Sequence, residues 1–336
     1  MKPQLSIIMP HYNDVETTIG TIESLYDTID IDKFELIVVN DGSRFAIPDS
    51  YKWRANAKYV SNFINMGVGQ AFDIGVRVAK SDNLILMGAD IRFEKNGWAD
   101  RMLSVINKHP KALIATTCGS TTNKNTRYYG ADVMFLVSND DLGPGHPRKH
   151  IIDYKSVLEG KWRLRTGRGV YQVPCLMGAF YGVTKEWYNF VRGFELHYKW
   201  GVLEPYISLK SWSLGGEVLV DTENKVNHIF NRKPQREALW DILIYNELMT
   251  AGIVFNSYGI KYANYLYESR TSAYELGSRI YMDKIESINQ MCTYINENRV
   301  IEPKELEEKM VAMSYHYNKD GNKYEIPLAK DLVSLQ

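Results

Sequence analysis

The sequence of 336 residues has only three cysteines, Cys118, Cys175 and Cys292, and they are widely separated. Because no two of them form a CxxC pair, a disulfide framework and a structural zinc site are both unexpected. The first apolar run, residues 5–9, is shorter than the core of a secretory signal. No run approaches the ~18 apolar residues of a membrane span. We therefore expect a cytoplasmic protein with no membrane span.

The sequence also lacks a net charge, because 40 Lys and Arg residues balance 40 Asp and Glu residues. This balance argues against a uniformly basic nucleic-acid-binding protein and against a polybasic membrane anchor. A dinucleotide-binding dehydrogenase is disfavoured, since no G-x-G-x-x-G follows the first apolar run. Apolar residues make up 45% of the chain and aromatic residues 12%, which is enough to build a large core and to exclude disorder as the main state.

Short apolar runs alternate with amphipathic stretches over the first 117 residues. The runs predict strands, and apolar residues at helical spacing between them predict helices. This alternation predicts an α/β fold in which helices cover both faces of a parallel sheet. The predicted strands lie at residues 5–9, 34–39, 58–60, 83–87 and 112–116.

Three of these predicted strands run directly into polar clusters, at residues 11–13, 40–42 and 88–90. Ligands of parallel sheets bind at the carboxyl ends of the strands, where these clusters fall. Each cluster alone has a structural explanation, since a strand that ends needs turn residues. Three such clusters in one sheet favour a binding site.

The order of the motifs resembles that of family 2 glycosyltransferases with the GT-A fold, a Rossmann-like sheet that binds nucleotide sugars. Later segments look especially like those of polypeptide N-acetylgalactosaminyltransferases. The resemblance covers about residues 4–232, and the motifs that carry it are Pro10-His-Tyr-Asn13 with Glu16, Val39-Asn-Asp-Gly-Ser43, Asn65-Met-Gly67, the strand ending at Asp90, Gly178 to Trp187, Gly193-Phe194, Trp200 to Glu204, and Val226 to Phe230.

The resemblance implies a domain organisation. Residues 1–232 would form the GT-A domain, with a nucleotide-binding half at 1–117 and an acceptor and catalytic half at 118–232. From about residue 234 the apolar periodicity is helical, and it recurs near 277–296 and 303–315. Residues 233–336 are therefore expected to form a C-terminal helical region.

The resemblance also implies a hexosyl- or N-acetylhexosaminyl-type glycosyltransferase with a UDP-sugar as donor. Asp41 would bond the uracil, and the backbone of residues 10–12 with the Glu16 carboxylate would hold base and ribose. Alternatively, Asp41 caps the Asn-Asp-Gly-Ser turn. The residues expected at the donor are Pro10, His11, Tyr12, Glu16, Asp41, Asn65, Gly67, Ala89 and Trp200.

A divalent cation, Mn²⁺ or Mg²⁺, would neutralise the leaving diphosphate. Family members usually carry Asp-x-Asp at the end of the fourth strand, whereas this chain has Gly88-Ala89-Asp90 and keeps only the second acid. His228 stands where the related transferases place a metal-binding histidine, and imidazole with carboxylate suits Mn²⁺. We expect Asp90 and His228 to share the cation, with weak metal binding or metal independence left open by the missing first Asp.

Glu204 fills the position of the general base in inverting members of the family. A base at this position would deprotonate the acceptor hydroxyl. Two alternatives stay open: Glu204 can be an acid that the helix dipole favours in a first turn, and Trp200-Gly201 resembles retaining enzymes that need no base. The sequence does not decide between inversion and retention.

The acceptor is expected to be a glycan or saccharide. One alternative is a hydroxymethylated base in DNA, because a basic cluster of Arg163, Arg165 and Arg168 with Trp162 and Tyr171 could bind phosphates and stacked bases. An alternative of another class is a non-catalytic nucleotide- or glycan-binding module, which the incomplete Asp-x-Asp suggests.

Overall fold

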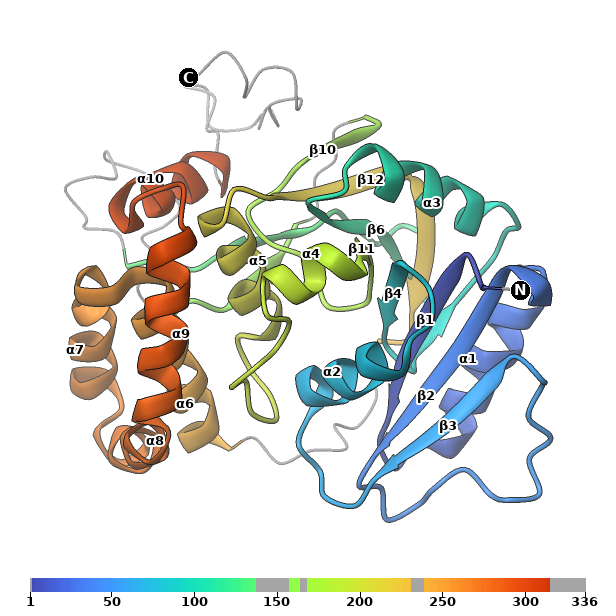
Figure 1. Ribbon diagram of the computed structural model, residues 1–336, viewed down its shortest axis with the longest axis horizontal. Coiled ribbons are helices and arrows are strands. Elements are labelled where there is room, and N and C mark those ends of the chain that lie inside the picture. The colour runs from blue at the N-terminus through green and yellow to red at the C-terminus, as the bar shows by residue number, and fades with distance from the viewer. Residues whose placement is uncertain (1, 137–156, 164–167, 231–238, 315–336) are drawn as a thin grey trace.

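The computed structural model describes residues 2–136, 157–163, 168–230 and 239–314 (Figure 1). At its centre is a large mixed sheet in the strand order β10-β12-β6-β11-β4-β1-β2-β3, to which β5 and β7 add at β12 and β6. The strands are β1 (Leu5–His11), β2 (Phe34–Asp41), β3 (Ala57–Asn62), β4 (Asn83–Met87), β5 (Ile91–Arg92), β6 (Ala112–Ser120), β7 (Arg127–Tyr128), β8 (Ala131–Val133), β9 (Gly160–Trp162), β10 (Val170–Gln172), β11 (Phe180–Thr184) and β12 (Glu217–His228).

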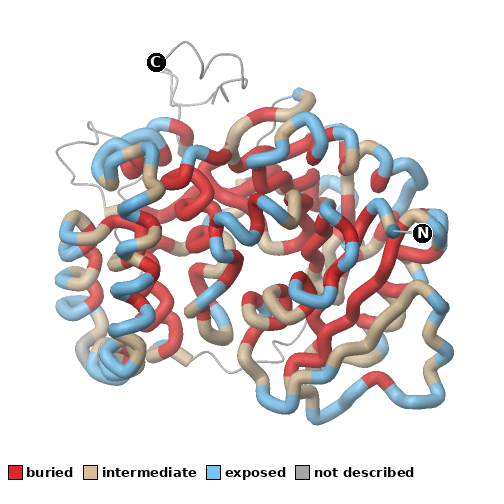
Figure 2. Tube along the Cα trace, in the orientation of Figure 1, coloured by how far each residue is buried: buried red, intermediate tan, exposed pale blue. Residues whose placement is uncertain are grey.

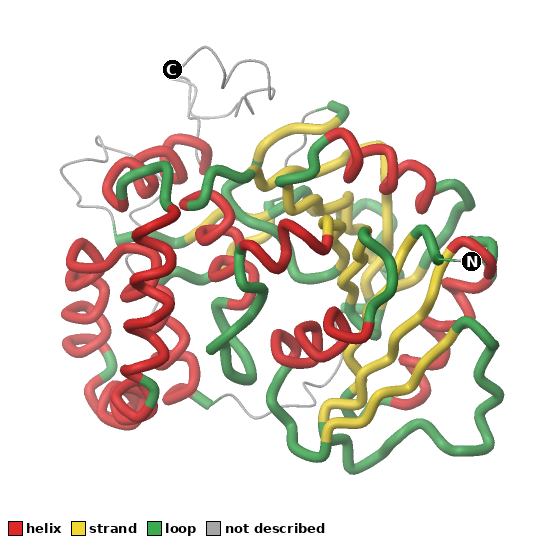
Figure 3. The backbone as a smooth tube through the Cα atoms, viewed as in Figure 1, coloured by secondary structure: helices red, strands yellow, loops and turns green. Residues whose placement is uncertain are grey.

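Helices surround this sheet, as Figure 3 shows. A single π-helical turn (Ala251–Phe255) and a 3₁₀ turn (Asn256–Gly259) connect α6 to α7, and a 3₁₀ turn (Ile31–Lys33) precedes β2. The α-helices are α1 (Val15–Tyr26), α2 (Val68–Val78), α3 (Trp98–Lys108), α4 (Lys185–Phe190), α5 (Leu203–Ser213), α6 (Trp240–Thr250), α7 (Ile260–Ser269), α8 (Thr271–Asp283), α9 (Ile285–Asn298) and α10 (Pro303–Ser314).

The predicted α/β fold with helices on both faces of the sheet is confirmed. Ile7 pairs with Ile85, which pairs with Gly182, so these three residues point to one face, and there Gly182 lies against Met102 of α3. Ile8 points to the other face, where Gly75 lets α2 approach closely. Alternation along β1 therefore separates α2 from α3 by the thickness of the sheet.

The strands predicted in the first 117 residues, β1, β2, β3, β4 and β6, all run in one direction, but the sheet as a whole is mixed. Strands β1, β2, β3 and β4 are parallel, and β12 is parallel to β6, but β11 runs antiparallel to both β4 and β6. Strand β10 is also antiparallel to β12. Parallel neighbours need a long crossover, usually a helix. In the described ranges between β6 and β11 the chain has no helix, which leaves the antiparallel arrangement available.

The apolar runs of the sequence form the centre of the core. Every residue of β1, β2 and β6 is buried, which places these strands between two layers of helices (Figure 2). Strand β6 extends to Ser120, beyond its predicted end, because its last residues pair with the end of β12 after a bulge. The predicted boundary between the two halves, at 117/118, therefore falls inside a strand.

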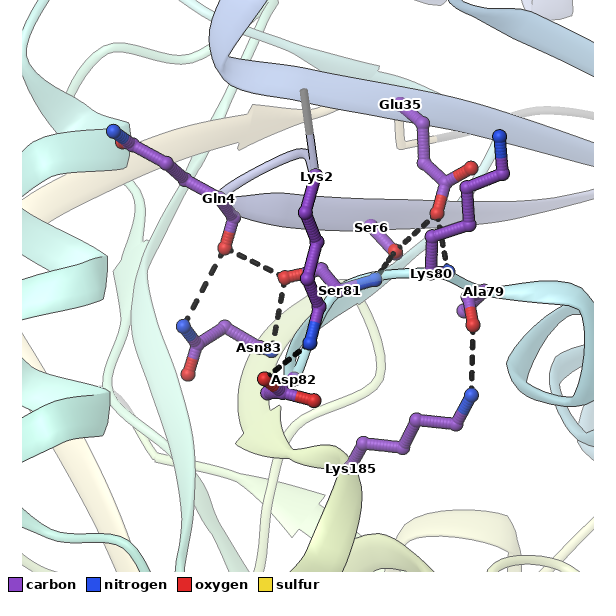
Figure 4. Close-up of polar contacts among 10 residues, drawn as sticks. All are labelled: Lys2, Gln4, Ser6, Glu35, Ala79, Lys80, Ser81, Asp82, Asn83 and Lys185. Carbon is purple, nitrogen blue, oxygen red and sulfur yellow. Dashed lines mark hydrogen bonds and ion pairs between the residues drawn. The ribbon is translucent and has the colours of Figure 1, made fainter.

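A polar network ties together the amino ends of the central strands, opposite the edge that carries the predicted site (Figure 4). Glu35 is buried and accepts hydrogen bonds from the Ser6 hydroxyl (2.6 Å) and the Lys80 backbone N–H (2.5 Å), and Lys58 pairs with it at 3.1 Å. Burial opposes ionisation of Glu35, but these contacts outweigh it and lower its pKa. This end of the sheet thus depends on one ionised carboxylate.

The C-terminal helices α6 to α10 lie beside α5 and away from the β1–β3 edge of the sheet (Figure 1). The Val300 backbone N–H donates to Ser213 at the end of α5 (2.8 Å), which is one of the direct links between the two regions. The proposed boundary at 232/233 lies outside the described residues, between the end of β12 and the start of α6. None of the helices in the described ranges has the length and apolarity that crossing a membrane requires.

Candidate active site

The carboxyl ends of the strands bring the predicted cation ligands together. Asp90 follows β4, and His228 is the last residue of β12. The short strand β5 pairs with β12 so that Ile91 faces His228, and the Ile229 N–H donates to the Asp90 carbonyl (3.0 Å). This pairing brings Asp90 Oδ2 to within 3.3 Å of His228 Nε2.

Gly88 determines how the Asp90 carboxylate lies. A Cβ at residue 88 would come within 2.6 Å of Asp90 Oδ1, so the carboxylate lies back over the glycine backbone. The Gly88 N–H donates to the Ala179 carbonyl (2.8 Å), which joins this turn to the start of β11. The first acid of the usual Asp-x-Asp is thus replaced by a residue whose missing side chain makes room for the second.

The residues fit a divalent cation, although with few protein ligands. The side chains of Asp90 and His228 are 28% and 18% exposed, so both are accessible at the edge of the sheet. Carboxylate with imidazole is a donor set that suits Mn²⁺. In the described part of the chain no group of three or more His, Cys, Asp or Glu residues could hold a metal. Any further ligands would have to come from a bound substrate or from water.

Aromatic rings surround His228. The centre of its ring lies 4.4 Å from that of Phe230 and 5.8 Å from that of Trp162. The Tyr128 ring packs on both, at 5.7 Å from Phe230 and 5.1 Å from Trp162. His228 Nδ1 is buried and has no hydrogen-bond partner within the described residues. The three aromatic residues, Tyr128, Trp162 and Phe230, are each half-buried, and we call them the aromatic cluster.

Glu204 lies in the first turn of α5, as predicted, and approaches the same edge of the sheet. Val202, at the start of the helix, has a left-handed backbone (φ 59°), and Gly201 before it has φ 93°. A Cβ at Gly178 would come within 2.8 Å of Glu204 Cδ, so the carboxylate lies directly over this glycine. Gly178 precedes Ala179, which bonds Gly88. Residues 178–179 therefore contact both the Glu204 carboxylate and the turn that carries Asp90.

Asp41 is only 2% exposed, and its carboxylate accepts four hydrogen bonds. The donors are the backbone N–H groups of Met66 (2.9 Å) and Gly67 (2.7 Å) and the side-chain amides of Asn65 (2.9 Å) and Asn62 (3.4 Å). Burial raises the pKa of Asp41 against the effect of these donors. These donors belong to residues 62–67 and not to the Asn-Asp-Gly-Ser turn, in which Asn40 Oδ1 accepts from the Ser43 N–H (3.0 Å). Asp41 therefore holds a different turn from the one expected, and a direct contact with uracil stays a prediction.

The predicted residues at the end of β1 divide into buried and accessible ones. Pro10 and His11 are buried, and the His11 ring contacts the Thr18 hydroxyl (2.8 Å) and the Phe45 carbonyl (3.1 Å). Burial lowers the pKa of His11. Its side chain therefore holds the loop at Phe45 and has no exposed face on which a base or sugar could stack. Tyr12, in contrast, is half-buried and Glu16 is exposed.

The turn at residues 65–67 contacts the loop that carries Trp200. The Lys199 N–H donates to the Met66 carbonyl (2.9 Å), and Gly67 (φ 95°) lies so close to Lys199 that a side chain there would overlap its backbone. Trp200 is 38% exposed. Ala89, on the other side of the edge, accepts a hydrogen bond from the Thr21 hydroxyl (2.6 Å). The predicted donor residues thus lie along one edge.

Two residues at this edge were not predicted. The positive charge of Lys199 acts to lower the pKa of Asp41. Asn246 of α6 donates a hydrogen bond to the carbonyl of Trp200, next to Lys199. A lysine next to Trp200-Gly201 could have been noticed in the sequence. Asn246 is one of three buried polar residues in α6, with Glu247 and Thr250, which makes it a weaker signal.

One arginine of the predicted basic cluster is largely buried. Arg163 has a side chain only 9% exposed, and its Nε lies 3.3 Å from Asp132, which is also largely buried. Arg165 lies outside the described residues. Arg168 is exposed. A buried arginine in an ion pair does not reach a phosphate backbone, so Arg163 gives no support to a DNA acceptor.

The open α/β sheet, with a carboxylate, an imidazole and a left-handed loop at its carboxyl edge, defines the GT-A class of nucleotide-sugar transferase folds. The sequence profile of Glycosyl transferase family 2 matches residues 6–186, and the chain belongs to this family.

Known proteins of this class resemble the chain at low identity. Polypeptide N-acetylgalactosaminyltransferase 4 of Caenorhabditis elegans is 22% identical over 241 residues, which is 69% of this chain and 39% of the relative. The chain thus spans about two fifths of the length of that relative. An uncharacterized glycosyltransferase of Haemophilus influenzae is 31% identical over 108 residues, 32% of this chain and 35% of that protein.

Solved structures show the same fold. A crystal structure of GalNAc-T7 with UDP, GalNAc and Mn²⁺ superimposes with a TM-score of 0.64 at 17% identity, covering 92% of this chain and 57% of that one. The mannosyltransferase PcManGT of Pyrobaculum calidifontis, in complex with GDP-Man and Mn²⁺, gives 0.50 at 12% identity and covers 93% and 88%. The predicted GT-A fold is confirmed.

Proposed function

We propose that this chain transfers a hexose or N-acetylhexosamine from a UDP-sugar to an acceptor hydroxyl. The observation that carries the proposal is the pairing of Asp90 with His228 at the carboxyl edge of the sheet, in a chain that belongs to family 2. The N-acetylgalactosaminyltransferase relatives and the UDP in the GalNAc-T7 structure support the choice of donor.

The donor would lie along the edge from β1 to the loop at Trp200. The backbone of residues 10–12 and the exposed Glu16 would hold base and ribose. Asp41 would act mainly by holding the 65–67 turn in place, because three of its four hydrogen bonds come from that turn. Trp200, Ala89 and that turn would then border the diphosphate and sugar.

Asp90 and His228 would hold the divalent cation. When bound, the cation would neutralise the charge that develops on the leaving diphosphate. Asp90 offers a hard carboxylate oxygen, and His228 offers Nε2 as a neutral imidazole ligand. With glycine at position 88, Asp90 and His228 are the two side chains that the described residues offer to the cation, and Mn²⁺ affinity in the absence of the donor should be weak.

Glu204 would be the general base for the acceptor hydroxyl. Its carboxylate lies over Gly178, whose neighbour Ala179 accepts a hydrogen bond from Gly88 in the turn that leads to Asp90. A base that acts in a direct displacement requires inversion at the anomeric carbon. Retention of the donor configuration in the product, read from an NMR coupling constant, would reassign Glu204 to binding sugar hydroxyls.

The acceptor would be a saccharide or glycan. The aromatic cluster of Tyr128, Trp162 and Phe230 is half-buried beside His228, and such rings can stack on the apolar faces of sugars. The alternative of a hydroxymethylated base in DNA lacks support from Arg163, whose charge is paired with Asp132. A salt-insensitive acceptor affinity would argue against it further. A cytoplasmic location stays a prediction.

Thermal-shift measurements with UDP-, GDP-, CDP- and dTDP-sugars, with and without MnCl₂, test the proposal. A ligand that binds only the folded state raises the melting temperature. We expect a UDP-sugar with Mn²⁺ to give the largest rise in melting temperature. The protein should also hydrolyse this donor slowly when no acceptor is present. A shift without any hydrolysis or transfer would favour the non-catalytic module, and no shift with any nucleotide sugar would refute the proposal.

A further inference from the structure

One buried amide of the C-terminal helical region bonds directly to the loop of the candidate site. Asn246, in the middle of α6, is fully buried. Its Oδ1 accepts from the Tyr198 N–H (3.1 Å), and its Nδ2 donates to the carbonyls of Tyr198 (2.8 Å) and Trp200 (2.9 Å). One side chain thus satisfies three backbone groups of the 198–200 turn.

The turn belongs to the loop between α4 and α5, residues 191–202, which has an unusual backbone. Among the described residues seven non-glycine residues have positive φ, and four of them lie in this loop, at Arg192 (57°), Leu196 (72°), Lys199 (49°) and Val202 (59°). Left-handed conformations are unfavourable for such residues and persist only where surrounding contacts impose them. The loop therefore depends on external hydrogen bonds for its shape.

Neighbours of Asn246 on α6 contact the same loop. The Tyr245 hydroxyl donates to the Leu196 carbonyl (2.7 Å), and Leu243 lies against Gly201, where a side chain would clash with it. From the opposite side, the Lys199 N–H bonds the Met66 carbonyl next to Gly67. The loop lies between α6, which contains no predicted site residue, and the turn that Asp41 holds.

We infer that Asn246 is a positioning residue for the nucleotide-sugar site, because it holds the 198–200 turn in the conformation that presents Lys199 and Trp200 to the donor. This inference rests on the proposed function. It also assigns a role to the C-terminal helical region, since α6 supports the donor side of the site from behind.

Two substitutions of Asn246 distinguish whether it holds the turn by hydrogen bonds or by packing. Asn246→Asp keeps the size and the acceptor for Tyr198 N–H, but it places a carboxylate oxygen against two carbonyl oxygens. Asn246→Leu fills the space without charge and leaves both carbonyls unpaired. If hydrogen bonds position the turn, both variants weaken donor binding, and the near-isosteric Asp is at least as damaging as Leu. If only packing matters, Asp is the milder change.

The experiment measures UDP binding by calorimetry with MnCl₂, together with KM for the UDP-sugar, kcat and the melting temperature. Full-length Asn246→Asp and Asn246→Leu are expected to weaken UDP binding and raise the donor KM by roughly tenfold or more, with a smaller change in kcat. Thr250→Val is the matched control: its hydroxyl is buried on the same helix and has no hydrogen-bond partner among the described residues. It should bind UDP like the wild type.

Tyr245→Phe removes one hydroxyl from the same support and covers the case in which the Asn246 variants do not fold. It should weaken UDP binding several-fold with the fold intact. Folded variants that bind UDP as tightly as the wild type would overturn the inference but leave the proposed function standing. Wild-type protein that binds no UDP or UDP-sugar overturns the proposed function and the inference with it.

Discussion

Substituting Gly178 by alanine should misplace the Glu204 carboxylate while leaving the fold intact. The new Cβ would lie 2.8 Å from Glu204 Cδ. Carbon atoms in contact prefer about 3.5–4.0 Å, so the carboxylate must move by roughly 1 Å. Because it is the end of a flexible side chain, this movement costs little stability. A displacement of about 1 Å at a reacting group can cost about 10²-fold in rate.

A double-mutant cycle tests this mechanism. Glu204→Gln alone should lower kcat by about 10²–10⁴-fold if Glu204 is the base. In the Glu204→Gln background, Gly178→Ala should have almost no further effect, because no base is left to displace. The coupling free energy would then be about 2–3 kcal/mol.

Gly160→Ala is the matched control for steric change near the same turn. A Cβ at residue 160 would make only an ordinary contact, 3.5 Å from Pro205 Cγ, next to Glu204 in sequence. Its kcat, donor KM and melting temperature should be those of the wild type. Additive losses in the cycle of Gly178→Ala with Glu204→Gln would refute the reasoning, because additivity means that the alanine acts elsewhere.

Three further predictions concern the divalent cation, the buried carboxylate of Asp41, and Glu35 at the amino ends of the central strands. Asp90→Asn and His228→Gln should each abolish the Mn²⁺-dependent part of the thermal shift by UDP-sugar, and an unchanged metal response would contradict their assignment. Asp41→Asn puts an amide N–H against donors, so it should lower both the melting temperature and UDP affinity, by about 1.5–3 kcal/mol in affinity; weaker UDP binding at an unaltered melting temperature would instead indicate direct uracil contact. Because the pKa of Glu35 is lowered on folding, its contribution to the free energy of unfolding is present at neutral pH and lost as pH falls through the folded-state pKa, below 4.5. Urea denaturation should therefore show Glu35→Gln less stable than wild type at neutral pH, with the gap closing in acid; a gap independent of pH would rule out the ionised carboxylate.

Local sequence patterns were sufficient to predict the parallel half of the sheet and the edge where the site lies. Strands β1, β2 and β4 are mostly apolar, buried runs that end in turn residues, and those two features depend only on neighbours in sequence. The same patterns could not predict the antiparallel entry of β11. A short apolar run is compatible with either direction, and the choice depends on which edge is free when the chain returns.

The amino-acid sequence by itself determined which chemical groups are available: one acid in place of two at residues 88–90, a histidine at 228, and a glutamate at the start of a helical run. Only the tertiary structure decided their surroundings. It brought Asp90 to 3.3 Å from His228, enclosed Asp41 among four donors, and placed Asn246 against a loop 46 residues earlier. Hydrogen-bond partners and burial are set by packing between segments distant in the chain, and no local propensity encodes them.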